Sequence, residues 1–190
     1  MNSTDNFPFP EFPTLKTKRL ILREVVLSDA EDVFIFRSDS HVQRFNSKPI
    51  VDVSEAREQI TQMKTTYERT DGIGWGITLK EQNIVIGMVG FWQWSYSNRV
   101  MLGYDLARDY WGKGITSEAV REIIRFGYEK MELNRIEAET IEDNHESRRM
   151  LEKLGFVLEG IRREYSLEND GKYHGSAMYA LLKSDYNPAK

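Results

Sequence analysis

Three consecutive strand-like runs restrict the fold of this chain more than any other feature. They are GWGITL, NIVIGMVGFWQW and RVMLGYDLA, and short polar turns at Lys80–Gln82 and Ser95–Asn98 separate them. β-Branched and aromatic residues favour strands, and turns this short join antiparallel neighbours. The pattern predicts an antiparallel meander that begins at Gly74.

The segment before the meander contains one expected strand and two expected helices. RLILREVV reads as a strand, and S-x-x-E capping boxes at Ser28–Glu31 and Asp52–Glu55 indicate helix starts. The second helix is expected to bury a face that carries Ala56, Ile60, Met63 and Tyr67.

The segment after the meander returns to alternating elements. A helix with Ile115, Ala119, Ile123 and Phe126 on one face is followed by the strand RIEAETI and by a short helix that Asn144 caps. GFVLEGIRREYSL and KYHGSAMYALL then form a closing hairpin around ENDG. The expected order is β-α-α-β-β-β-α-β-α-β-β, which describes one α/β domain over residues 1–190 with a mixed, mostly antiparallel sheet flanked by helices.

Composition excludes several classes of protein and site. The chain has 190 residues, a net charge of −4, no cysteine and three histidines far apart in sequence. These values argue against nucleic acid as a partner, and they exclude disulfides, thiolate metal sites and a cysteine nucleophile. We expect no metal. The absence of a membrane-length apolar run and of a signal peptide predicts a cytoplasmic protein with no membrane partner.

The first thirteen residues include NFPFPEFP, in which prolines alternate with aromatic residues. Proline fixes φ and donates no hydrogen bond, so residues 1–13 are expected to form an extended arm. Two interpretations stay open. The segment is either a loosely ordered tail, or an arm whose Phe7, Phe9 and Phe12 pack on the body or on a second subunit.

A glycine pair stands where the meander gives way to a helix, in DYWGKGITSEA. Gly112 and Gly114 let the backbone approach a ligand closely, and the N–H groups of the first helical turn have no intrahelical acceptor. Phosphate and pyrophosphate are the natural ligands of such a turn. Taken alone, the tripeptide fits a tight turn without any ligand at least as well.

The wider pattern decides between these interpretations. GYDLARDYWGKGITSEAV, followed later by IEDNHESRRMLEKLGFVLEG, resembles the GNAT superfamily of acetyl-CoA-dependent N-acetyltransferases. The chain looks most like the branch that contains the ribosomal-protein N-terminal acetyltransferases, and the resemblance runs from LKTKRLILRE to AMYALLKSDY.

The resemblance implies a binding site for acetyl-CoA. The backbone amides of Trp111, Gly112, Lys113, Gly114, Ile115, Thr116 and Ser117 would hold its pyrophosphate. Tyr104, Asp105 and Leu106 would splay from the next strand and pair with the pantetheine arm, which Asn144 would contact from the other side. The family's loop usually has Gln or Arg where this chain has Asp109, which matters little for a cradle of backbone groups.

The resemblance also implies two catalytic candidates. Ser147 would place a hydroxyl near the coenzyme sulfur, although a capping role is the plain alternative. The family's usual tyrosine acid is replaced here by Leu151. Glu164 would act as a base, would recognise the amine, or would be a solvated carboxylate paired with Arg162 or Arg163; strand alternation places Arg162 on its face, which favours recognition or water-mediated proton removal. His174 is a weaker candidate base.

The expected reaction is acetyl transfer to a primary amine, directly in a ternary complex because no cysteine can carry the acetyl group. The favoured acceptor is a protein or peptide N-terminal α-amine, as on a ribosomal protein. A polyamine or aminoglycoside acceptor, and a catalytically silent CoA-binding protein, stay open as alternatives. We also expect a homodimer, since the arm and the aromatic-rich strands offer much apolar surface.

Overall fold

A computed structural model describes residues 9–95 and 97–187 of the chain. The first eight residues of the predicted arm, Phe7 included, lie outside the described residues. The meander is confirmed: β3 (Ile73–Leu79), β4 (Val85–Ser95) and β5 (Arg99–Leu106) are antiparallel neighbours. They follow β1 (Leu15–Lys16) and β2 (Leu20–Arg23) in one sheet.

The whole sheet has eight strands in the order β1-β2-β3-β4-β5-β6-β8-β7. Its second part consists of β6 (Arg135–Ile141), β7 (Val157–Leu167) and β8 (Tyr173–Leu182). Every described neighbouring pair is antiparallel except β5 and β6, which run parallel. The expected order of elements is confirmed, with the two-residue β1 as an addition.

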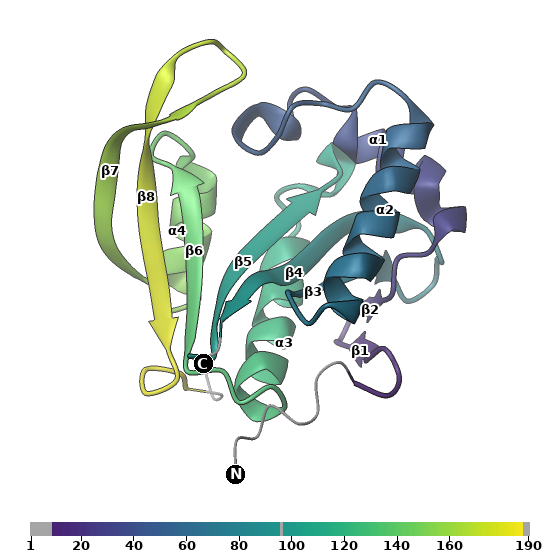
Figure 1. Cartoon of the computed structure of the whole chain (residues 1–190), viewed down its shortest axis with the longest axis horizontal. Coiled ribbons are helices and arrows are strands. Elements are labelled where there is room, and N and C mark those ends of the chain that lie inside the picture. Colours follow the sequence, from purple (N-terminus) through teal and green to yellow (C-terminus); the bar gives the residue numbers. More distant parts are fainter. Residues whose placement is uncertain (1–8, 96, 188–190) are drawn as a thin grey trace.

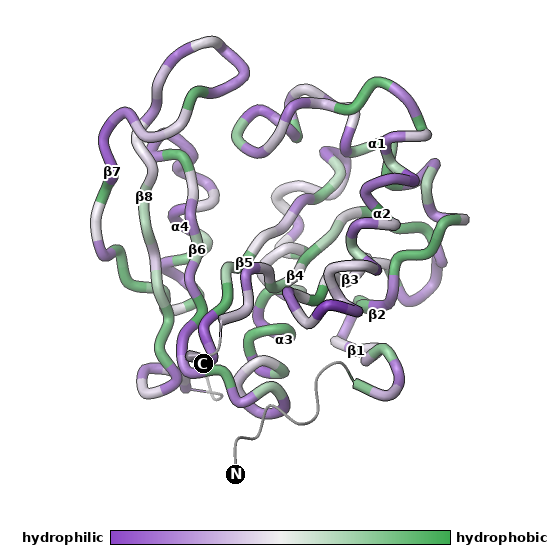
Figure 2. Tube along the Cα trace, in the orientation of Figure 1, coloured by the Kyte–Doolittle hydropathy of each residue, from purple (hydrophilic) through white to green (hydrophobic). Residues whose placement is uncertain are grey.

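Helices cover the two faces of the sheet separately (Figure 1). On one face, α1 (Ala30–Arg37) and α2 (Val53–Glu68) enclose a small core with Val33, Phe36 and Ile60. On the other face lie α3 (Ile115–Glu129) and α4 (His145–Lys153). The main core lies between the sheet and α3, whose buried residues belong to it, and the tube of α3 is partly hydrophobic (green) in Figure 2.

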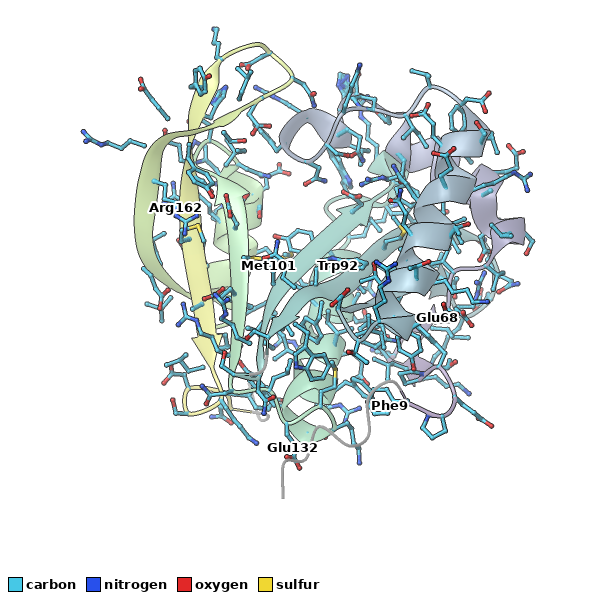
Figure 3. All side chains as sticks on the ribbon, in the orientation of Figure 1. Phe9, Glu68, Trp92, Met101, Glu132 and Arg162 are labelled. Atoms are coloured by element: carbon cyan, nitrogen blue, oxygen red, sulfur yellow. The ribbon has the colours of Figure 1, made fainter. Side chains whose placement is uncertain are left out.

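The described part of the N-terminal arm packs on the body of the protein. Phe9 lies beside Phe126 with ring centroids 5.3 Å apart, and Phe12 lies 5.1 Å from the ring of Tyr67. The indole N–H of Trp75 donates to the backbone oxygen of Pro13 over 2.7 Å. Figure 3 shows Phe9 at the lower end of the molecule, near α3. Phe9 and Phe12 therefore use their apolar surface within their own chain.

Within the described residues, three short 3₁₀ turns accompany the helices. Leu27–Asp29 precedes α1, Gln43–Phe45 lies in the loop between α1 and α2, and Arg108–Tyr110 follows β5. The capping box expected at Asp52 and Glu55 is present. The box expected at Ser28 is wrong, because Asp29 instead accepts from the backbone N–H of Val26 and forms an ion pair with Arg23.

Candidate active site

In the middle of the sheet, β5 and β6 separate (Figure 1). The two strands pair from Arg99 with Arg135 as far as Leu102 with Ala138. Beyond that point Gly103–Leu106 stays paired only with β4, and Glu139–Ile141 only with β8. Residues from both strands line a cleft of about 1030 Å³. The inner edge of β5 there presents backbone groups that an extended ligand can pair with.

The glycine-containing turn lies at one end of this cleft. Gly112 and Gly114 both have φ near +70°, and Gly114 is the N-cap of α3. A Cβ at Gly112 would meet nothing within 4 Å, and one at Gly114 would meet only Arg19 Nη2, at 3.7 Å. Both glycines line the cleft. The backbone is thus bare toward the open space beside a helix N-terminus, which fits a pyrophosphate.

Side chains from the turn between β1 and β2, and from α3, hold this glycine turn in place. Arg19 donates to the backbone oxygen of Lys113 over 2.9 Å and forms a 2.6 Å ion pair with Glu118. Thr17 also donates to Glu118. Burial raises the pKa of Glu118, but the hydrogen bonds from Thr17 and Arg19 outweigh burial and hold this pKa below its ordinary value. Sequence reasoning missed Arg19 and Glu118, which lie 99 positions apart.

The other wall of the cleft carries the start of α4. The side-chain oxygen of Asn144 accepts from the backbone N–H of Ser147 over 3.2 Å, so Asn144 caps the helix as expected. The Ser147 hydroxyl lies 2.6 Å from the hydroxyl of Tyr104 on β5. Burial raises the pKa of Tyr104 to about 12, although the bond with Ser147 opposes the rise. The sequence predicted a role only for the backbone of Tyr104.

Asp105 lies in the same cleft, next to Tyr104, and its side chain is 8% exposed. Its carboxylate pairs with Arg37 at the end of α1 and accepts from the side chain of Asn46. Burial raises the pKa of Asp105, and the guanidinium of Arg37 offsets only part of the rise. Asp105 thereby ties the splayed strand to the loop between α1 and α2.

The tip of the β7–β8 hairpin reaches across to that same loop (Figure 1). The side-chain amide of Asn169 donates to the backbone oxygens of Gln43 and Ser47, each over 3.1 Å. On the other side of the tip, the imidazole of His174 lies 3.0 Å from Asp170 and 3.1 Å from Asp143, which lines the cleft. Hydrogen bonds with Asp170 and then with Asp143 raise the pKa of His174.

The predicted site residues fall into two groups. The first group lines the cleft and consists of Tyr104, Asp105, Leu106, Asn144, Ser147 and the residues of 111–117 other than Lys113. The ammonium of Lys113 lies 5.4 Å from the centre of the Tyr110 ring. Glu164 lies elsewhere: it is exposed on β7, the outer strand, and it is not among the residues that line the cleft.

The backbone at Glu164 departs from the regular strand that the sequence predicts. Glu164 has φ +48°, and the register with β8 shifts between Arg162 and Ser166. The guanidinium of Arg162 stacks on the ring of Tyr165 at 4.7 Å. Strict alternation, which would place Arg162 and Glu164 on one face, does not hold here, because a β-bulge adds unpaired residues to one strand.

Within residues 9–95 and 97–187, no group of three or more His, Asp or Glu residues is arranged to hold a metal ion. None of the helices in this part of the chain is long and apolar enough to cross a membrane.

Comparisons with known proteins agree with this geometry. Residues 19–157 match the family model of the acetyltransferase (GNAT) domain. The chain is 38% identical to an uncharacterised N-acetyltransferase, p20, of Bacillus licheniformis, over 91% of this chain and 98% of that protein. It is 25% identical to the ribosomal protein uS5 alanine N-acetyltransferase of Escherichia coli, over 93% and 94% of the two chains.

A solved structure shows the same fold. The ribosomal L7/L12 α-N-protein acetyltransferase RimL, in complex with coenzyme A, superposes with a TM-score of 0.82. The match covers 90% of this chain and 98% of the RimL chain, at 20% sequence identity.

Proposed function

The chain belongs to the GNAT acetyltransferase family, and we propose that it transfers the acetyl group of acetyl-CoA to the N-terminal α-amine of a protein or peptide. The observation that carries this proposal is the cleft between β5 and β6, which a bare glycine turn lines and beside which the hairpin tip is bonded to the loop between α1 and α2. The cleft offers room for an elongated donor and for an acceptor beside it.

The residues of the cleft fit the parts of acetyl-CoA. The N–H groups from Trp111 to Ser117 would hold the pyrophosphate, with the charge of Lys113 nearby. The free edge of Tyr104–Leu106 would pair with the pantetheine arm, and Asn144 would lie on its other side. When bound, acetyl-CoA supplies a thioester that an amine can attack.

Residues of the chain then assist a direct transfer. The sequence has no cysteine, so no acetyl-cysteine can form, and direct transfer with both substrates bound is the simplest mechanism. The hydroxyl of Ser147 faces the cleft and is placed to donate a hydrogen bond where negative charge develops on the leaving sulfur. Glu164, exposed on the outer strand, would attract the cationic acceptor before it enters.

Two features support an α-amine acceptor. Relatives such as the E. coli uS5 enzyme are named for alanine N-acetylation of a ribosomal protein. The bond from Asn169 to the loop at Gln43 and Ser47 also lies next to the cleft residues Arg44–Asn46, and it favours a slender acceptor such as a peptide N-terminus over a bulky aminoglycoside. Such an acceptor would enter beneath the hairpin tip.

The test is a screen of acetyl-CoA consumption over N-terminal peptides, polyamines and aminoglycosides. We expect turnover with peptides that carry a free α-amine and none with the same peptides blocked at that amine. Turnover confined to polyamines or aminoglycosides would replace the proposed acceptor. Binding of acetyl-CoA without turnover on any amine would indicate the catalytically silent protein.

A further inference from the structure

Two hydroxyl groups from different elements meet in the cleft, at Tyr104 and Ser147, 2.6 Å apart. Each is mounted on a fixed backbone. Tyr104 lies on the splayed end of β5, where β4 pairs with it at Val89. Ser147 lies in the first turn of α4, where Asn144 accepts its backbone N–H. The hydrogen bond therefore joins two separately anchored walls.

The chemistry of the two groups indicates which one donates. A phenol is more acidic than an aliphatic alcohol, and a serine oxygen has two lone pairs to accept with. Tyr104 keeps its proton at neutral pH, because burial raises its pKa to about 12. A largely buried phenol hydrogen needs an acceptor, and the Ser147 oxygen lies within reach. With Tyr104 as donor, the hydrogen of Ser147 is left to point elsewhere.

Ser147 has few other directions for that hydrogen. Serine in a helix often donates to the carbonyl four residues earlier, but Ser147 lies in the first turn, and that position, Asp143, precedes the helix. Ser147 itself lines the cleft. A hydroxyl that accepts from Tyr104 on one side is thus oriented to donate into the cleft on the other.

We propose that Tyr104 is a positioning residue, whose hydroxyl donates to Ser147 and turns the Ser147 hydrogen toward the coenzyme sulfur. This inference rests on the proposed function, since it takes the cleft to hold the thiol-ended arm of the coenzyme. Ser147 keeps its own proton. It donates a hydrogen bond as the carbon–sulfur bond breaks and the electron pair passes to sulfur, while the amine forms the carbon–nitrogen bond and releases its surplus proton to water.

The test measures the bound thiol itself and needs no acceptor. Calorimetry compares coenzyme A with desulfo-coenzyme A, and thiolate absorbance gives the thiol pKa in the complex. In the wild type we expect a thiol pKa below that of free coenzyme A and a preference for the sulfur-containing form that grows with pH. Ser147→Ala should reduce that preference about tenfold, because a hydrogen bond to a charged group is lost.

Tyr104→Phe should raise the thiol pKa of bound coenzyme A, but by less than Ser147→Ala does. In Tyr104→Phe, Ser147 keeps its hydrogen but loses its orientation. The double variant should match Ser147→Ala, and Ser147→Thr should restore the preference. Tyr128→Phe is the matched control: it removes a buried tyrosine hydroxyl, bonded to the backbone oxygen of Leu181 over 2.7 Å, outside the cleft. It should leave the thiol pKa unchanged.

The possible failures are distinguishable. An unchanged thiol pKa and sulfur preference in Tyr104→Phe, with coenzyme A still bound, would overturn the positioning role alone. No binding of coenzyme A to the wild-type protein would overturn the proposed function, and this inference with it.

Discussion

The imidazole of His174 lies 3.0 Å from the carboxylate of Asp170, and this contact closes the tip of the β7–β8 hairpin on itself. The neighbouring residue, Asn169, bonds to the loop between α1 and α2, and Asp143 approaches His174 from the other side. The backbone N–H of Lys172 also donates to Asp170. The tip is therefore held by neutral hydrogen bonds from Asn169 and by the contacts of the His174 imidazole with two carboxylates.

This arrangement predicts a pH-dependent hairpin. Since hydrogen bonds with Asp170 and Asp143 raise the folded-state pKa of His174, protonated His174 stabilises the tip. The contribution is complete below the unfolded pKa, near 6.5, and is lost as pH rises through the raised value. Proton NMR titration should find a pKa above 6.5 that falls in Asp170→Asn. A pKa at or below 6.5 in the wild type would contradict the account.

The glycine turn predicts a steep difference between neighbouring substitutions. Gly114→Val should weaken acetyl-CoA binding severely, because Gly114 has φ +70° and its side chain would project where the phosphates are expected. Lys113→Ala should cost much less, since it removes only a point charge. Gly171→Val is the matched control for backbone strain, because Gly171 has φ +76° and lies in the hairpin turn, outside the cleft.

Calorimetry with acetyl-CoA measures the effect, and urea unfolding measures the strain in both valine variants. We expect both variants to lose stability and only Gly114→Val to lose binding. Equal affinity for wild type and Gly114→Val would remove the turn from the coenzyme site.

The ion pair between Arg37 and Asp105 predicts strong energetic coupling. Removal of one partner from a buried pair leaves an unpaired charge, so Arg37→Met should lower the free energy of unfolding by about 3 kcal/mol. Arg37→Met combined with Asp105→Asn should cost less than the sum of the single changes. Urea denaturation of the four proteins completes this double-mutant cycle, and additive costs would show that the pair is not coupled.

Substitution of Glu164 distinguishes between its three possible roles as a base, a recognition residue and a surface residue. Because it is exposed and outside the cleft, we expect Glu164→Gln to raise the KM for the acceptor and to leave kcat unchanged. Steady-state kinetics over varied peptide concentration tests this. A collapse of kcat would instead make Glu164 the base, and unchanged constants would make it a surface residue.

Local signals explain why much of the fold was predictable from the sequence. The meander follows from β-branched runs and short turns, and the starts of α2 and α4 follow from Asp52 and Asn144, whose side chains cap them as expected. The glycine turn is predictable because φ near +70°, as at Gly112 and Gly114, favours glycine over other residues.

Long-range contacts explain what was missed. The bond between Tyr104 and Ser147 joins residues 43 positions apart, and that between Asn169 and Ser47 joins residues 122 positions apart. No local pattern encodes either contact. The bulge at Glu164 has no local signal for another reason: it interrupts a strand whose residues suit regular alternation, so the alternation expected from Arg162 to Glu164 does not apply there.

Mass spectrometry of the acceptor tests the central claim most directly. The wild-type protein is incubated with acetyl-CoA and a peptide that carries both a free α-amine and an internal lysine, and fragmentation locates the acetyl group. We expect one acetyl group, on the N-terminal nitrogen, and loss of that product in Gly114→Val. Acetylation of the lysine, or no acetylation of peptides alongside turnover of polyamines or aminoglycosides, would contradict it.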